Sequence, residues 1–199
     1  MKQLLLVVVL IVVVGLVTIT CGGGGGGGAG PTAPTAPTEV SIAGEWTGEK
    51  RVTSFSGGGC YGAELAAHLA EHPTVFDWAY TETITQTGSV ISASRTMRYW
   101  LDYPEIVCEE PCDSCESSGS ISGSTYTLTD DSCIGDEMEA PSCSPEELGI
   151  QRLVAASQTG TVSGNTISGT GEETVNVFEA NGDPAGVLTV RYSFTQNRG

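Results

Sequence analysis

Short stretches of alternating apolar and polar residues, with little chain between them, limit what this sequence can fold into more than any other feature. The clearest stretch is 188–195, where Leu, Val, Tyr and Phe alternate with Thr, Arg and Ser, the pattern of a strand with one buried face. Similar stretches are 42–55, 76–86, 90–101, 125–129, 152–158 and 166–178. Parallel strands need crossovers of a dozen or more residues, and almost none is available here. We therefore expect an antiparallel sheet of about seven to nine strands.

Two internal repeats indicate how these strands are joined. QTGSV at 86–90 recurs as QTGTV at 158–162, and GSISGST at 119–125 recurs as GTVSGNT at 160–166. Each copy ends a strand, turns at a glycine and starts the next strand. Hairpins in series form a meander, which closes most readily into an up-and-down β-barrel without open edges. The prediction is an all-β antiparallel barrel, with a two-sheet β-sandwich as the alternative, and one short helix over 62–72.

The first forty residues read as a leader and a tether. After Lys2, the apolar run 4–19 is typical of a secretory signal, and we expect a signal peptide over 1–20. As a helix the run spans about 24 Å, which is short of the ~30 Å hydrocarbon layer of a membrane. A tether follows over 21–40, with seven consecutive glycines and a PTAPTAPT repeat. The folded domain is expected over 41–199.

Cys21, directly after this leader, resembles the cleavage box of bacterial lipoproteins, in which the cysteine becomes the lipidated first residue of the mature chain. The resemblance implies attachment to a membrane through Cys21 and a location in the cell envelope, exposed to the periplasm or the exterior. Gly22 after the cysteine is similar to the outer-membrane sorting pattern, if the cell has two membranes. The alternative is an ordinary disordered N-terminus without an anchoring role.

A short motif at the start of the first predicted strand suggests a kind of barrel. Gly44, Glu45 and Trp46 resemble the GxW signature of lipocalin-type and related small ligand-binding barrels. In that family the tryptophan plugs one barrel end, and a basic residue of the last strand crosses it. The resemblance implies that Gly44, Trp46 and Arg191 form this end of the barrel.

The remaining cysteines suggest disulfides. In an exported protein an even set of six predicts three bonds, although the sequence leaves their pairing open. The six are Cys60, Cys108, Cys112, Cys115, Cys133 and Cys143. Five of them lie in an acidic insertion over about 102–147, which has 13 acidic residues and no lysine or arginine. We interpret this segment as a decorated loop that is interrupted by a hairpin over 118–130 and held by crosslinks against charge repulsion.

This insertion contains two patterns that could indicate a metal site. Cys108, Cys112 and Cys115 have CxxxCxxC spacing, which resembles the iron–sulfur site of radical SAM enzymes, but the export signal and the short chain favour disulfides. Calcium could bind carboxylates, yet no EF-hand spacing is present. The acids considered for calcium are Asp130, Asp131, Asp136, Glu137 and Glu139.

The predicted helix carries a third candidate metal site. His68, Glu71 and His72 spell HxxEH, which resembles the zinc motif of inverted-motif peptidases. Two imidazoles one turn apart can bind zinc, and the carboxylate can deprotonate a bound water. A zinc-dependent hydrolase is the alternative function that this motif implies, whereas our main expectation includes neither a metal nor a catalytic residue.

Charge and the lack of other motifs complete the functional expectation. With 24 acidic against 8 basic residues, the net charge of −16 opposes binding to nucleic acid. We expect a non-enzymatic, monomeric domain without a cofactor that binds a small apolar ligand or an envelope partner. A purely structural protein, or one that interacts with the envelope, is the alternative, with its core filled by Trp46, Trp78, Tyr80 and Phe194.

Overall fold

The computed structural model describes residues 40–107, 114–130, 132–141 and 148–199, all within one compact unit, Pro37–Gly199. Its elements are β1 (Gly44–Gly57), α1 (Gly59–Glu71), β2 (Trp78–Thr87), β3 (Val90–Trp100), β4 (Tyr103–Val107), β5 (Ser114–Ser122), β6 (Thr125–Asp130), β7 (Glu137–Pro141), β8 (Leu148–Ser163), β9 (Thr166–Phe178) and β10 (Pro184–Arg198). The predicted signal peptide and nearly all of the tether lie outside the described residues, as do Cys21, Cys108, Cys112, Cys143 and Asp131. No helix within the described ranges has the length and apolarity needed to span a membrane.

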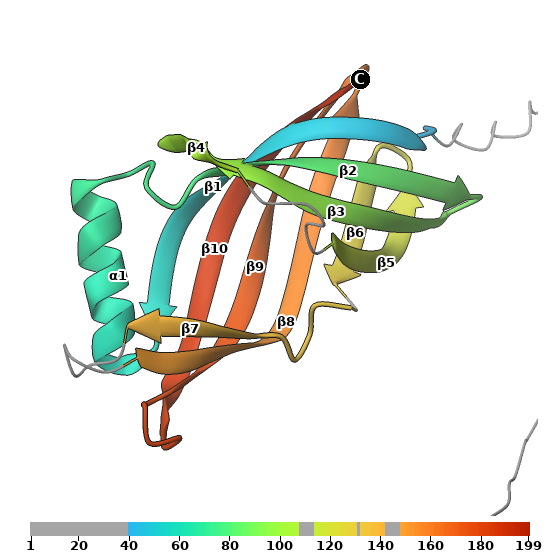
Figure 1. Ribbon diagram of the computed structural model, residues 1–199. Coiled ribbons are helices and arrows are strands. Elements are labelled where there is room, and N and C mark those ends of the chain that lie inside the picture. The colour runs from blue at the N-terminus through green and yellow to red at the C-terminus, as the bar shows by residue number, and fades with distance from the viewer. Residues whose placement is uncertain (1–39, 108–113, 131, 142–147) are drawn as a thin grey trace, which may run out of the picture. The chain divides into compact units, whose positions relative to one another are not determined.

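Eight of the strands form a closed antiparallel barrel (Figure 1). Neighbouring strands follow the order β2-β1-β10-β9-β8-β6-β5-β3, and β2 also pairs with β3, which closes the ring. Each ring strand therefore lies beside the ring strands that precede and follow it in the chain. This confirms the predicted all-β meander and its closure into a barrel, with one short helix, and it replaces the two-sheet alternative.

The acidic insertion is part of the barrel. β5 and β6 are two of the eight ring strands, and β6 pairs directly with β8. β4 pairs with the end of β3, and β7 pairs with the start of β8, so both extend the sheet beyond the ring. The hairpin predicted over 118–130 is confirmed by the pairing of β5 with β6. The interpretation of the segment as a loop was wrong in one respect, because this hairpin also pairs with β3 and β8 and so completes the ring.

Three of the four repeat copies have a glycine at a tight hairpin turn. The fourth, QTGTV at 158–162, lies inside β8, so the turn predicted at Gly160 was wrong: this glycine makes room for the Tyr126 ring. Gly88, Gly123 and Gly164 each take the first position of a two-residue turn, with φ of 58°, 60° and 60°. Such turns suit the twist of paired strands and need a residue that tolerates positive φ. The turn chemistry that predicted a meander is thus the chemistry that forms it.

Aromatic rings fill the interior of the barrel near the start of β1. The buried cluster there consists of Ile42, Trp46, Ile84, Ile91, Ala93, Ile121, Tyr126, Leu128, Val162, Ile167, Tyr192 and Phe194. Glycines on the neighbouring strands, paired in register with the tyrosines, make room for the rings: a Cβ at Gly160 would lie 2.5 Å from the Tyr126 ring, and one at Gly171 would lie 2.3 Å from that of Tyr192. We call this the closed end.

Helix α1 lies at the other end of the barrel, where β1, β8, β9 and β10 extend past the shorter β5 and β6 (Figure 1). Tyr61 and Leu65 of the helix pack into a second buried cluster with Val175, Val177, Leu188 and Val190. The Tyr61 hydroxyl and the side-chain amide of Gln151 are hydrogen-bonded, which ties the helix to β8. We call this the open end.

Disulfide bonds are present, as the cysteine content suggested. Cys115 on β5 is bonded to Cys133, with the two Cα atoms 5.3 Å apart. Cys60, at the start of α1, is also disulfide-bonded, and its partner lies outside the described residues. Because Cys115 is in a disulfide, it cannot serve as a thiolate ligand in the CxxxCxxC arrangement.

Candidate functional site

The closed end is plugged by Trp46. Its side chain is fully buried, and its indole N–H donates to the Ile42 carbonyl at 2.8 Å. The guanidinium of Arg198 stacks over the ring, 4.8 Å from its centre, and Arg198 is the residue paired with Trp46 in the sheet register. Gly44 is at the start of β1, where a Cβ would approach the Arg198 side chain to 4.0 Å.

The assignment of Arg191 to this plug was wrong. Side chains alternate between the two faces of β10, and Tyr192 and Phe194 point into the barrel, so Arg191 lies on the outer face. Its side chain is 53% exposed and pairs with the carboxylate of Glu172 at 2.9 Å. The cation that crosses the tryptophan is therefore Arg198, seven residues later and on the inner face.

A buried polar network crosses the centre of the barrel. Arg95 donates from Nε at 3.0 Å and from Nη2 at 2.6 Å to one carboxylate oxygen of Glu82, and its Nη2 donates to Gln158 at 2.5 Å. Gln196 donates to the other Glu82 oxygen at 2.5 Å. Burial raises the pKa of the Tyr80 hydroxyl above its ordinary value, so the neighbouring phenol is neutral. The centre is thus a balanced ion pair and not an apolar cavity.

Lys50 is the one residue that brings an amine into the barrel. It is the only lysine after Lys2, and its side chain is buried on the inner face of β1. Lysine is almost never fully buried without a partner. The Lys50 ammonium forms an ion pair with the carboxylate of Glu173 on β9 and lies 4.0 Å from the ring centre of Tyr192.

The Lys50–Glu173 pair lies where the barrel begins to open. Lys50 is paired in register with Trp78, the first residue of β2, and its ammonium is 5.0 Å from that ring centre. The Glu173 side chain is 23% exposed and that of Lys50 is 5% exposed, so solvent reaches the pair from the carboxylate side. The amine is therefore at the inner limit of the open end.

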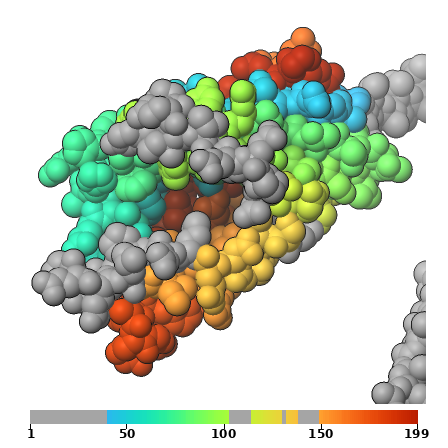
Figure 2. Space-filling model, viewed as in Figure 1, coloured from blue at the N-terminus to red at the C-terminus, as the bar shows by residue number. Residues whose placement is uncertain are grey.

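Half-buried apolar side chains line the wall beside this pair. Trp100 pairs with Trp78 and Met97 pairs with Tyr80, so all four share the inner face of β2 and β3. Trp78, Met97 and Trp100 are only partly buried, in contrast to Trp46. The surface beside α1 is hollowed, with red atoms of the C-terminal strands at its bottom (Figure 2). An aromatic wall next to a buried amine is the candidate binding site, which we call the Lys50 site.

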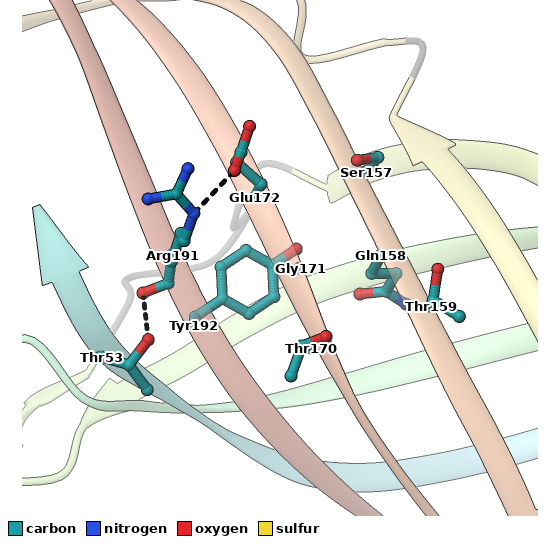
Figure 3. A pocket seen from close by; sticks show the side chains of 9 residues that line it. All are labelled: Thr53, Ser157, Gln158, Thr159, Thr170, Gly171, Glu172, Arg191 and Tyr192. Carbon is teal, nitrogen blue, oxygen red and sulfur yellow. Dashed lines mark hydrogen bonds and ion pairs between the residues drawn. The ribbon is translucent and has the colours of Figure 1, made fainter. Parts of the chain in front are cut away.

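Two grooves lie elsewhere on the molecule. One, of about 400 Å³, crosses β8, β9 and β10 and is lined mostly by exposed polar side chains, among them Thr159, Thr170 and the Arg191–Glu172 pair (Figure 3). The other, of about 380 Å³, lies between α1 and β1, where Leu69 and Phe55 are among its lining residues. We call the first the outer groove.

The histidines of the HxxEH motif lie on exposed positions of α1 and directly after it. The ring centres of His68 and His72 are 4.8 Å apart, and the His68 ring also packs near Phe76 at 5.8 Å. Glu71 is exposed at the last position of the helix. Within the described ranges, no group of three or more potential metal ligands comes together.

The acidic residues considered for calcium are only partly described. Glu137 forms an ion pair with Arg152 on β8, and Asp136 is exposed. The side chains of Asp130, Asp131 and Glu139 lie outside the described residues.

Sequence reasoning missed the Lys50–Glu173 and Arg95–Glu82 pairs and the role of Arg198. The sequence did contain a signal for Lys50: it is the only lysine after residue 2, and it lies within a predicted strand of alternating residues. The partners were not visible, since Glu173 is 123 residues from Lys50 and Glu82 is 13 residues from Arg95.

No protein-family model matches the chain, and no curated protein matches it significantly.

Proposed function

We propose that this protein is an exported, non-enzymatic β-barrel that is attached to the cell envelope through lipidated Cys21 and binds one small, largely apolar molecule at the Lys50 site. The observation that carries the proposal is the buried Lys50–Glu173 pair beside partly exposed Trp78 and Trp100. Exposed apolar surface of this kind is what a ligand would cover, and a few fixed polar groups would orient it. The domain is proposed to act as a monomer and without nucleic acid.

The polarity of the site refines the proposed ligand. The central interior holds Glu82, Arg95 and Gln158 in one network, so the ligand is not expected to enter the centre of the barrel. It would rest its apolar body on Trp78, Met97 and Trp100 and place one polar group at Lys50. Such a ligand carries one polar group at one end and is apolar over the rest of its surface.

A structural role is the second candidate function. The aromatic rings of the closed end are packed against glycines, and Trp46, Tyr80 and Phe194 are buried, as expected for a filled core. Trp78, the fourth expected core residue, is only partly buried. This difference favours binding at the open end over a core that is filled throughout.

Titration with phenylnaphthylamine, a neutral apolar dye, tests the proposal. We expect the dye to bind once per barrel and Trp78→Ala to raise its Kd at least tenfold, about 1.4 kcal/mol, because the variant removes the ring next to Lys50. Dye emission reports binding, and circular dichroism reports folding. Trp100→Ala is the second variant, should Trp78→Ala not fold.

The matched control is Thr170→Ala in the outer groove, which is expected to leave the Kd unchanged. Absence of saturable binding to the wild type would refute the proposed function. An equal loss of affinity in Thr170→Ala would place the dye in the outer groove and would also refute it.

A further inference from the structure

We propose that Lys50 attaches an aldehyde ligand covalently, as a protonated imine with Glu173 as its counter-ion. The inference rests on the proposed function, because it assigns the chemistry of the ligand held at the Lys50 site. It starts from the position of the amine: the only lysine in the body of the chain is on the inner face of the barrel and not on its surface. Ordinary lysines contribute solubility and surface charge, and this one contributes neither.

The surroundings of Lys50 already stabilise a cation. The Glu173 carboxylate supplies the negative charge, and the faces of Tyr192 and Trp78 lie 4.0 Å and 5.0 Å from the ammonium. A protonated imine carries the same single positive charge as an ammonium. Condensation would therefore replace one cation with another in a site that is built for a cation, without burying a new charge.

The residue next to Lys50 shows the contrast with an ordinary surface cation. The Arg51 side chain is 57% exposed on the outer face and pairs with Glu49 at 2.8 Å. Two adjacent cations on β1 thus have opposite environments. Arginine, which stays protonated, is on the outside, and the amine that can become a nucleophile is inside.

Glu173 can move the protons that the condensation requires. It accepts one proton from the Lys50 ammonium, and the free amine nitrogen forms a C–N bond to the aldehyde carbon as the C=O π bond breaks. A proton then passes from this nitrogen to the oxygen, which gives a neutral carbinolamine. Glu173 then returns the proton to the carbinolamine hydroxyl, the C–O bond breaks, and water leaves. The sum is R–CHO plus Lys–NH3⁺ giving R–CH=NH⁺–Lys plus H2O, so no oxidant or reductant is consumed.

The wall of the site specifies the rest of the ligand. Trp78 and Trp100 are neighbours in register on β2 and β3, and both are partly exposed. Flat aromatic surfaces favour a flat partner, and conjugation next to the imine would spread its charge over the ligand. The predicted ligand class is therefore an aromatic or conjugated aldehyde that enters past the more exposed Glu173.

Reductive trapping with naphthaldehyde and cyanoborohydride, on the full mature chain at neutral pH, tests the inference. We expect one adduct that maps to the peptide containing Lys50. It should form at least tenfold faster than on the amine of acetyl-lysine amide, because the wall holds the aldehyde beside Lys50 and Glu173 takes the proton that the site otherwise keeps on the ammonium. Glu173→Gln should slow its formation at least tenfold, because the proton carrier is removed. Lys50→Arg should give no adduct at this peptide.

The outcomes separate the two proposals. Dye binding to the wild type without an adduct at Lys50 would overturn the covalent inference and leave the proposed function standing. If the wild type neither binds the dye nor forms an adduct at Lys50, the covalent inference and the proposed function are both overturned. An adduct at Lys50 that forms no faster than on acetyl-lysine amide would show unspecific labelling and would also overturn the inference, whether or not the Glu173→Gln and Lys50→Arg variants fold.

Discussion

Replacing Arg95 with methionine is expected to destabilise the barrel by about 3–5 kcal/mol, because the Glu82 carboxylate would remain buried without its cation. In the native barrel Glu82 accepts two hydrogen bonds from Arg95 and one from Gln196, and its side chain has no exposed surface. A chain of this size loses roughly 2–4 °C of melting temperature per kcal/mol. Urea unfolding followed by circular dichroism measures the effect.

Two control variants give this prediction its meaning. Arg51→Met breaks an exposed ion pair and is expected to change stability by less than about 1 kcal/mol. The double variant Glu82→Gln with Arg95→Met removes both charges and should be more stable than Arg95→Met alone. If the free energy of unfolding of Arg95→Met lies within about 1 kcal/mol of the wild-type value, the polar network does not stabilise the barrel as we predict.

Replacing Trp46 with alanine is expected to cost about 3–5 kcal/mol, through the lost burial and the cavity that remains. Trp46 is fully buried at the closed end, and Arg198 covers its ring on the solvent side. The ring therefore separates the barrel interior from water at this end. The free energy of unfolding in urea, again by circular dichroism, provides the measurement.

The matched variants for the plug are Trp46→Phe and Arg191→Met. Phenylalanine keeps most of the apolar ring and should lose clearly less stability than alanine. Arg191 is exposed on the outer face, so Arg191→Met is expected to have an effect under about 1 kcal/mol. A larger loss for Arg191→Met than for Trp46→Ala would contradict the assignment of the plug to Trp46 and Arg198.

Local chemistry explains why the barrel could be predicted from the sequence. Alternation fixes which residues form strands, and the turns at Gly88, Gly123 and Gly164 force consecutive strands to pair. Closure follows because a long meander has two edge strands, and the unpaired backbone N–H and C=O groups of one can hydrogen-bond to those of the other. None of these steps needs knowledge of distant contacts.

The site could not be predicted to the same extent, because it depends on register between distant strands. Arg191 and Arg198 both lie on the last strand, and the register of β10 against β1, which pairs Arg198 with Trp46 and Arg191 with Ser54, decides which of them covers the ring. Lys50 and Glu173 belong to strands that are separated in the ring by β10. Periodicity places each residue on a face of its own strand, but it does not say which residue of another strand it meets.

Native mass spectrometry of the protein extracted from its own membrane tests the central claim most directly. The account predicts a chain that begins at Cys21, carries acyl groups and retains one small molecule per barrel, with that molecule absent from the Trp78→Ala variant. If the wild-type protein carries no bound molecule beyond those also found on Trp78→Ala, ligand binding at the Lys50 site is contradicted.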